Sequence, residues 1–485
     1  MRAKIAAPKA GLARDEAPPM TNFANGESGS AAPGLARRIG LFDATMIVMG
    51  GIIGAGIFIN PYVVAQQIHT PALILCAWIC GGLVAMAGAL VYAELAARFP
   101  AVGGQYAYLR DAYHPGVAFL YGWALLLVVQ TGGMAAVAIT FGHYCAELTG
   151  ASISTGALAA LALGMLTLIN CLGVRAGSTV QSALMVMKIV IIAALVFCAA
   201  VWGGSSRAAV SPLLDRPPGF PLLAAFGAAM VPVMFSYGGY HTANFIAGEM
   251  REPRKNLPSA LVMGVTGVVA LYVGVNFVCV RVLGAAGLAA TRTPASAVMR
   301  IALGQRGATW IALGIAISAL GFLSQSILTA PRVYFAMAED GVFFRSVAWL
   351  SPRTRVPVVA IAVQGVWAIV IALSGRYEQI LNFMISIDLM FIGLSAASVF
   401  VFRRRQRAGG AIDRDDLYRT PGHPFTTIGF VSACWLVVVA TFYHYPQYSL
   451  VGLGITLTGL PVYFIWGMRG GRRAAPGQFS GGANG

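Results

Sequence analysis

Four glycines stand among the seven residues from Gly50 to Gly56, inside an apolar stretch that runs from about residue 41 to residue 67. Each of them costs a helix interior about 0.8–1 kcal/mol relative to alanine. In a membrane, the backbone groups that unwinding frees are tolerated only where they line a cavity and meet a partner there. The pattern therefore predicts a helix that is interrupted within the membrane, with a binding site at the interruption.

A second apolar stretch, at about 221–248, carries a similar interruption, because Gly238 and Gly239 lie there between aromatic and polar residues. Interrupted segments at corresponding positions in two halves of a chain indicate a transport site near the middle of the membrane. The competing explanation for the first stretch is close helix packing, since Gly50 and Gly54 have the small-xxx-small spacing of membrane helix contacts. The presence of a second interruption favours the binding site.

The two interruptions offer complementary backbone groups. A half-helix that begins inside the membrane presents unpaired N–H groups and the positive end of its dipole, which suit a carboxylate. A half-helix that ends there presents unpaired carbonyls, which suit an ammonium. An α-amino acid carries both groups on one carbon and satisfies both sets. The N–H groups expected to take part are those of Gly54, Ala55, Gly56 and Ile57. The carbonyls expected to take part are those of Ile52, Phe235 and Gly238.

Side chains and neighbouring backbone complete the predicted site. The substrate-binding set comprises Ile52, Ile53, Gly54, Ala55, Gly56, Ile57, Phe235, Ser236, Gly238, Gly239 and Ser326. Phe235 and His241, which flank the second interruption, are also the predicted gating residues. His241 is as compatible with packing or gating as with sensing pH. No cofactor or metal site is expected, since the seven cysteines fall in or beside apolar stretches without metal-ligand spacing and suit small core residues.

Lys188 lies near the middle of a predicted span, where a cation costs several kcal/mol unless it faces a cavity or a partner. We expect it to contact carbonyls of the first interruption, with Ser324 or Ser326 as further partners, and to act in coupling. The alternative is a buried structural lysine. Glu94 and Glu249 lie at predicted cytoplasmic ends, where ion pairs or gates are expected. Asp388 lies inside a span and is a candidate for coupling or gating.

The composition requires a helical membrane protein. Of 485 residues, 58% are hydrophobic and 10% are charged, against about 25% charged in average proteins. Apolar runs of about 20 residues recur throughout, which is the length that a membrane helix needs. Twelve candidate spans place both termini on the same side of the membrane. They are approximately 41–67, 71–97, 115–146, 154–172, 176–202, 221–248, 257–283, 307–337, 357–374, 379–402, 424–443 and 447–468.

The net charge of +16 invites a nucleic-acid partner, but the positions of the charges explain it better. Lys and Arg concentrate in segments that are cytoplasmic if the N-terminus is inside, most densely from Arg403 to Arg407, and this follows the positive-inside rule. We therefore expect no nucleic acid, and a multi-pass protein of the plasma membrane, the inner membrane in a bacterium, with both termini cytoplasmic. The expected partners are the lipid bilayer and a small-molecule substrate, with the chain as a monomer or homodimer.

Four motifs carry a resemblance to a known family. They are Gly51-Ile52-Ile53-Gly54-Ala55-Gly56-Ile57-Phe58, the interruption at Phe235–Gly239, Gly248-Glu249-Met250-x-x-Pro253-x-x-x-Leu257-Pro258, and Pro331-Arg332-x-x-Phe335-x-Met337-Ala338-Glu339-Asp340-Gly341. In this order, over about residues 38–468, they resemble the amino acid–polyamine–organocation (APC) superfamily, in particular sodium-independent bacterial and L-type amino acid transporters.

The resemblance implies an all-α LeuT-like fold of twelve transmembrane helices, with a 5+5 inverted repeat in which helices 1 and 6 are discontinuous, followed by helices 11 and 12. It also implies alternating access and an amino acid held between the two interruptions. Ala55 stands where the family often has serine, so the N–H is kept and a hydroxyl is lost. Phe235 falls on the family's aromatic lid. Lys188 matches the lysine that replaces a sodium ion in sodium-independent members.

The expected domains are a disordered cytoplasmic tail, two repeats, a final helix pair and a second disordered tail. Their bounds are 1–36, 37–203, 204–403, 404–470 and 471–485.

The predicted function is secondary active transport of amino acids, sodium-independent and driven by exchange or by protons. Neutral or broad-range substrates are favoured, because no carboxylate stands near the second interruption to pair with a cationic side chain. A cationic amino acid or polyamine antiporter is the alternative. A channel would need a continuous polar lining that these spans lack. An enzyme would need a nucleophile–base or metal constellation, and the six histidines are scattered. A transporter-like sensor has no positive support.

Overall fold

The computed structural model describes residues 37–99, 102–149, 153–204, 213–214, 216–374, 377–408, 417–444 and 446–470. The predicted tails, 1–36 and 471–485, lie outside the described residues. Within these ranges the chain is helical, apart from connecting turns and one isolated bridge between Ile39 and Met250.

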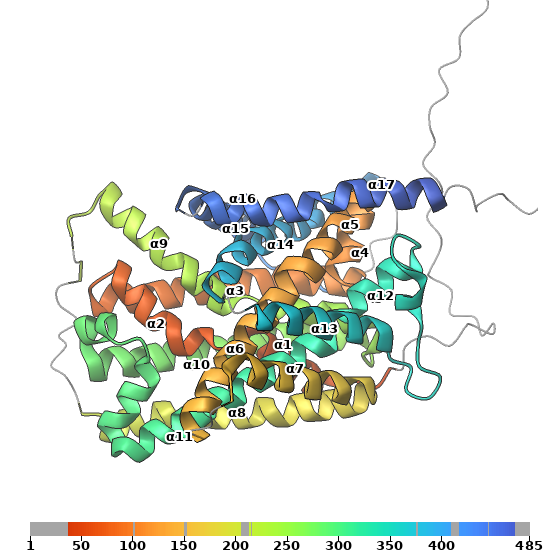
Figure 1. The fold of residues 1–485 in the computed structure, drawn as a ribbon. Helices are drawn as coiled ribbons and strands as arrows, with labels where there is room; N and C mark the ends of the chain where they lie inside the picture. The colour runs from red at the N-terminus through yellow and green to blue at the C-terminus, as the bar shows by residue number, and fades with distance from the viewer. Residues whose placement is uncertain are drawn as a thin grey trace, which may run out of the picture. The chain divides into compact units, whose positions relative to one another are not determined.

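The structure is a succession of helices, which Figure 1 labels in chain order. The first half contains α1 (Leu41–Ile52), α2 (Gly56–Gln67), α3 (Pro71–Arg98), α4 (Gln105–Ala112), α5 (Pro115–Ala124), the π-helical turn η1 (Leu125–Val129), α6 (Gln130–Thr149), α7 (Thr155–Cys171) and α8 (Val174–Trp202). The second half contains α9 (Phe220–Tyr237), the 3₁₀ helix η2 (Tyr240–Glu249), α10 (Pro253–Ala290), α11 (Pro294–Thr329), α12 (Pro331–Glu339), the 3₁₀ turn η3 (Arg345–Ala348), α13 (Val358–Leu373), α14 (Tyr377–Ala408), α15 (Phe425–His444), α16 (Pro446–Leu457) and α17 (Gly459–Gly470).

In the described part of the chain, ten helical segments are long and apolar enough to cross a membrane. The helices α7 and α13 are apolar but shorter, and they coincide with the predicted spans 154–172 and 357–374. Every apolar segment predicted from the sequence therefore corresponds to helical structure. The prediction of an all-α integral membrane protein is confirmed.

Polar caps and prolines set the beginnings of several helices. Thr70 accepts a hydrogen bond from the first turn of α3, and Pro71 follows it. His114 caps α5 in the same way ahead of Pro115, and Ser154 caps α7. A side-chain oxygen or ring nitrogen at this position satisfies one of the free N–H groups of the first turn, and proline is well suited to the first helical position because it needs no N–H partner.

Both predicted interruptions are present. The helix with the first interruption ends at Ile52, and the chain is helical again from Gly56. The helix with the second interruption ends at Tyr237, and the chain is helical again from Tyr240. The two breaks meet, because a Cβ on Gly239 would fall 2.1 Å from the carbonyl oxygen of Gly51. Gly239 also has a φ of 97°, which glycine adopts without strain. This contact holds the two broken helices against each other in the interior.

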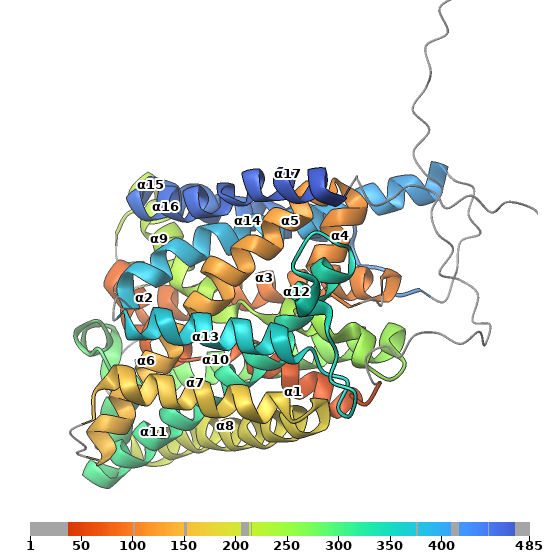
Figure 2. The same ribbon diagram turned by 45° about the vertical axis from the view of Figure 1, so that its right-hand side comes forward.

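The two views of the ribbon agree on what surrounds the breaks. The helices α8 and α11 lie side by side along one edge of the bundle, and α16 and α17 lie along the opposite edge (Figures 1 and 2). The helix α1 lies between them, and each of its residues from Ala44 to Ile52 is buried. The first break is therefore enclosed by protein, and lipid does not reach it.

The stretch between the predicted spans 257–283 and 307–337 is mostly helical, although no span was expected there. The helix α10 continues past a kink at Gly284, and α11 starts early and kinks at Gly304. Each of these glycines has a φ of 68°. A positive φ redirects the chain sharply, so each of these two long helices bends within its length. The fall in hydrophobicity that bounded the predicted spans therefore does not mark the end of the helix.

Candidate functional site

A cavity of about 440 Å³ lies at the two breaks. This volume is within the range of pockets that bind small molecules, roughly 300–1,000 Å³. Its walls come from α1 and α2, η1 and α6, α9 and η2, α11, α14 and α15. Most of the lining is apolar. The polar and charged residues that line it are Asn60, Gln67, Gln130, Ser236, His241, Thr242, Gln325, Ser326, Asp388 and Thr441.

The start of α2 leaves N–H groups free at the cavity. Gly54 N–H is already satisfied, because it donates to the Ile52 carbonyl at 3.0 Å. Among the described residues, the N–H groups of Ala55, Gly56 and Ile57 have no acceptor. The first N–H groups of any helix lack partners within the helix and carry the positive end of its dipole. An anionic group at this wall of the cavity would meet both.

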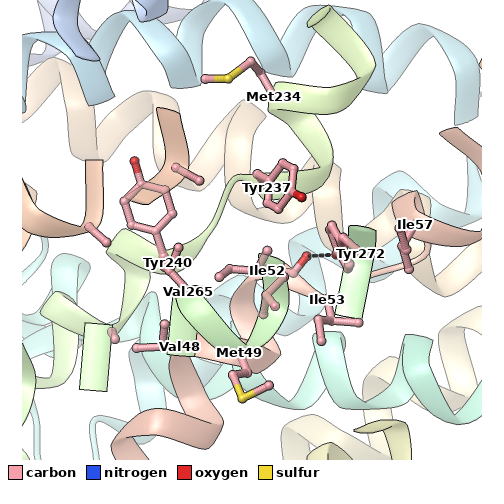
Figure 3. Close-up of a cluster of buried hydrophobic side chains, with 14 of the residues drawn as sticks. Val48, Met49, Ile52, Ile53, Ile57, Met234, Tyr237, Tyr240, Val265 and Tyr272 are labelled. Atoms are coloured by element: carbon pink, nitrogen blue, oxygen red, sulfur yellow. Dashed lines mark hydrogen bonds between the residues drawn. The ribbon is translucent and has the colours of Figure 1, made fainter. Parts of the chain in front are cut away.

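Two of the three carbonyls expected to hold an ammonium already have partners: the Ile52 carbonyl accepts two hydrogen bonds and the Phe235 carbonyl accepts one. Tyr272 Oη donates to the Ile52 carbonyl at 3.2 Å (Figure 3), and the Gly238 N–H donates to the Phe235 carbonyl at 3.2 Å. A carbonyl oxygen has two lone pairs. The Phe235 carbonyl can therefore accept a second hydrogen bond, whereas the Gly54 N–H and Tyr272 Oη together occupy both lone pairs of Ile52. The carbonyls of Phe235 and Gly238 thus remain available to an ammonium, and the Ile52 carbonyl, which the sequence also suggested, is already occupied.

Two members of the predicted substrate set do not reach the cavity. Ile53 and Ile57 are fully buried and belong to the hydrophobic core beside the first break (Figure 3). The other predicted substrate residues, Ile52, Gly54, Ala55, Gly56, Phe235, Ser236, Gly238, Gly239 and Ser326, line the cavity. Ile53 takes part through its carbonyl alone, which accepts a hydrogen bond from Lys188.

Lys188 is fully buried and links α8 to the first break. Its Nζ donates to the Ile53 carbonyl, just beyond the end of α1, where the helix dipole favours a cation. The ammonium also lies close to α11, because a Cβ on Gly321 would fall 3.3 Å from Nζ. The hydrogen bonds of the described residues include none between Lys188 and Ser324 or Ser326.

A hydrogen bond between α2 and α9 was missed by the sequence analysis. Asn60 Nδ2 donates to Ser236 Oγ at 2.7 Å and to the Pro232 carbonyl at 3.1 Å. Ser236 Oγ in turn donates to that carbonyl at 2.8 Å. The signal was an asparagine one helical turn after Gly56, inside an apolar segment. Asn60 ties the two helices together at the wall of the cavity.

A second polar link joins α11 to the second break. Gln325 Nε2 donates to Thr242 Oγ1 at 2.6 Å, and Thr242 Oγ1 donates to the Gly239 carbonyl at 2.7 Å. Both side chains line the cavity, and the sequence analysis named neither. The neighbouring Ser326 lines it as predicted, and its carbonyl accepts a hydrogen bond from Gln364 at 3.1 Å.

The predicted gating residues both line the cavity. Phe235 lies in the last turn of α9, and His241 lies just past the second break. The His241 ring lies 5.8 Å from the rings of Tyr92 and Tyr240. Its Nδ1 has no hydrogen-bond partner among the described residues. His241 therefore packs in an aromatic cluster at the cavity, an arrangement compatible with packing and with gating.

Asp388 also lines this cavity, from α14. From the sequence, no carboxylate was expected near the second break to pair with a cationic side chain. The fold corrects that statement, because α14 brings Asp388 into the same cavity as Gly238 and Gly239 although about 150 residues separate them.

Buried ion pairs close the structure at the end where α1 begins. Arg332 donates to both carboxylate oxygens of Glu249, at 2.6 and 3.2 Å, and both side chains are fully buried. Glu94 forms ion pairs with Arg98 at 2.8 Å and Arg403 at 2.7 Å. Glu94 and Glu249 thus take part in the ion pairs expected for them.

The cavity extends in the opposite direction. It reaches Gln67, the last residue of α2, and Thr441, near the end of α15. The backbone of residues 38–39 bonds to the Glu249 carbonyl, which places the ion-pair end beside the start of α1. The breaks therefore lie between a cavity on one side and a charged, closed region on the other.

Comparisons with known proteins agree with this geometry. A family model described as amino acid permease matches residues 39–466. The serine/threonine exchanger SteT of Bacillus subtilis (strain 168) is 30% identical over 441 residues, which cover 89% of this chain and 97% of the relative. The human large neutral amino acids transporter small subunit 2 is 29% identical, covering 91% and 83%, and the mouse b(0,+)-type amino acid transporter 1 is 27% identical, covering 89% and 88%.

The family model spans most of the chain and all the elements that build the cavity. The APC resemblance found in the four motifs is confirmed. The chain belongs to the amino acid permease family, and it is a multi-pass membrane transporter and not an enzyme.

Proposed function

We propose that this permease is a sodium-independent secondary transporter that exchanges α-amino acids by alternating access, with neutral or broad-range substrates. The observation that carries the proposal is the group of free N–H donors at the start of α2, which faces a cavity shared by both breaks. The substrate carboxylate binds the N–H groups of Ala55 and Gly56, which line the cavity. Its ammonium binds the carbonyls of Phe235 and Gly238, which can still accept hydrogen bonds.

Relatives support exchange as the mode of transport, since one is named a serine/threonine exchanger. They also support neutral side chains, since another is named for large neutral amino acids. Proton symport is the second mode compatible with the site. Phe235 covers the bound substrate as a lid, with His241 beside it.

Lys188 supports independence from sodium. Its Nζ donates to the Ile53 carbonyl where the first half-helix ends, so a protein amine occupies the place at which a bound sodium ion would meet this carbonyl. Lys188 acts in coupling, because its contact is to the same break that binds the substrate. A cation buried at this depth needs such a partner.

Alternating access requires that the two ends of the cavity open in turn. The cavity and the ion-pair region represent one of the two states, in which Glu249–Arg332 and Glu94–Arg403 close the cytoplasmic end. In this proposal α7 and α13 also cross the membrane, which gives twelve spans and places both termini in the cytoplasm. Residues 37–203 and 204–403 are the inverted repeats, 404–470 the final helix pair, and the plasma membrane is the location, as a monomer or homodimer.

The proposal is tested with the purified protein in lipid vesicles. Vesicles preloaded with an unlabelled neutral amino acid should take up a labelled one faster than empty vesicles, equally in sodium and in choline buffers. An imposed proton gradient on empty vesicles separates symport from exchange. Strict dependence on sodium would contradict the role of Lys188. Absence of any amino acid uptake by folded protein would overturn the proposal as a whole.

A cationic amino acid or polyamine antiporter is the second candidate. The observation that favours it is Asp388, a carboxylate in the wall of the cavity.

A further inference from the structure

Asp388 is the charged residue of the cavity wall. Among the described residues that line the cavity, it is the one Asp or Glu, and no Lys or Arg is present. It lies on the face of α14 that also brings Met384, Ile385, Leu389 and Ile392 to the cavity. These positions recur with helical spacing, so α14 presents one face to the cavity with the carboxylate at its centre. The side chain is half-buried and accessible from that space.

No protein group compensates this carboxylate. In the described part of the chain, Asp388 forms no ion pair and no hydrogen bond. Two nearby hydroxyls are engaged elsewhere: Tyr92 Oη donates to the Ile392 carbonyl at 3.1 Å, and Tyr121 Oη donates to Gln105 Oε1 at 2.8 Å. Ionisable residues inside membrane spans are costly, and they mark substrate or ion pathways. A cationic partner for Asp388 would therefore come from the contents of the cavity.

The charges of the proposed substrate leave Asp388 unmatched. In the proposed function, the α-carboxylate and the α-ammonium of the substrate are held by the two breaks. Lys188 is directed at the Ile53 carbonyl and does not line the cavity. A neutral amino acid would thus leave one negative charge uncompensated in the wall. A substrate with a second cationic group would remove it.

We propose that Asp388 is a specificity-determining residue that binds the side-chain cation, ammonium or guanidinium, of dibasic α-amino acids. The inference rests on the proposed function, because it takes the α-amino and α-carboxyl groups to be held at the breaks. It extends the substrate range from neutral to dibasic amino acids. The half-buried position of Asp388 lets water solvate it when a neutral substrate is bound, so neutral substrates are accepted as well, at lower affinity than dibasic ones.

The experiment compares matched substrates in the vesicle exchange assay. Arginine is paired with citrulline, which has the same length and no side-chain charge, and lysine is paired with norleucine. Asp388→Asn keeps the size of the side chain and removes the charge. We expect the arginine-to-citrulline and lysine-to-norleucine ratios of kcat/KM to fall at least tenfold in Asp388→Asn. Glu252→Gln, which removes an exposed carboxylate at the start of α10, should leave both ratios at the wild-type value.

Asp388→Glu keeps the charge and serves if the asparagine variant does not fold. It should keep a preference for arginine over citrulline. A wild-type protein that exchanges citrulline and norleucine but neither dibasic substrate would overturn the inference and leave the proposed function standing. Equal loss of all four substrates in folded Asp388→Asn would assign the residue to coupling, and it would overturn the inference too. Unchanged arginine-to-citrulline and lysine-to-norleucine ratios in Asp388→Asn would also overturn the inference. Wild-type protein that exchanges no α-amino acid would instead overturn the proposed function.

Discussion

The two breaks carry similar glycine signals and use them differently. At the first break, the N–H groups that begin α2 have no partner among the described residues and face the cavity. At the second break, Gly238 N–H bonds to the Phe235 carbonyl, and Thr242 N–H bonds to the Gly239 carbonyl at 3.1 Å. The second break thus satisfies much of its own backbone and packs against Gly51. The comparison teaches that Gly56 at the first break leaves a donor free for a ligand, whereas Gly239 at the second serves close packing against Gly51.

The largest effect is expected from adding a methyl group to Gly239, the glycine that packs against Gly51. Gly239→Ala should lose most of the folded protein, because Cβ would lie 2.1 Å from the Gly51 carbonyl oxygen. The positive φ alone costs a non-glycine residue about 1–2 kcal/mol, and overpacking typically adds about 1–3 kcal/mol. Thermal unfolding in detergent and yield by size-exclusion chromatography measure the effect.

The matched control is Gly227→Ala in α9, where a Cβ would meet no atom within 4 Å. Alanine favours a helix interior over glycine by about 1 kcal/mol, so this variant should be as stable as wild type or slightly more stable. Gly239→Ala with wild-type stability would show that the two breaks do not pack as described.

The second-largest effect is expected at Gly56, whose N–H group is free at the cavity. Gly56→Leu should abolish substrate binding and leave the protein folded, because the new side chain occupies the space in front of the free N–H groups. A Cβ at Gly56 would lie 3.2 Å from Asn60 Nδ2 and from Ser236 Oγ, which are side-chain ends that can shift. Binding is measured by substrate-induced stabilisation and by exchange in vesicles. Unchanged affinity in a folded Gly56→Leu protein would remove the site from the start of α2.

The sequence predicted the helices and both breaks, because their signals are local. Long apolar runs specify spans, and clustered glycines specify where a span is interrupted. What it could not predict were contacts between residues far apart in the chain. The carboxylate of Asp388 was recognised as unusual, but its place in the cavity depends on how α14 packs. The helical stretches beyond Gly284 were missed because a positive φ at one residue leaves no trace in hydrophobicity.

The third-largest effect is expected at Lys188, whose Nζ donates to the Ile53 carbonyl at the first break. Lys188→Ala should lower the rate of exchange at least tenfold, whereas expression should change less than twofold. The expected reason is that the Ile53 carbonyl loses its hydrogen-bond partner and the first break loses the lysine amine. A tenfold change corresponds to about 1.4 kcal/mol. Lys255→Ala, at an exposed position in α10, is the control and should match wild type. Equal losses of exchange and of folded protein would make Lys188 a structural lysine.

The smallest effect is expected where the two broken helices are joined by side chains. Asn60→Ala removes the 2.7 Å hydrogen bond to Ser236 but leaves the free N–H groups of α2 in place. A buried hydrogen bond contributes about 1 kcal/mol, so we expect KM to rise about fivefold with a stable fold. Ser236→Ala should have a similar effect. If both act through the same hydrogen bond, the double variant should be no worse than either single variant, since the second substitution finds no bond left to remove. Additive losses would instead mean that Asn60 and Ser236 each contact the substrate separately, and the link between the two breaks would then rest on Gly51 and Gly239 alone.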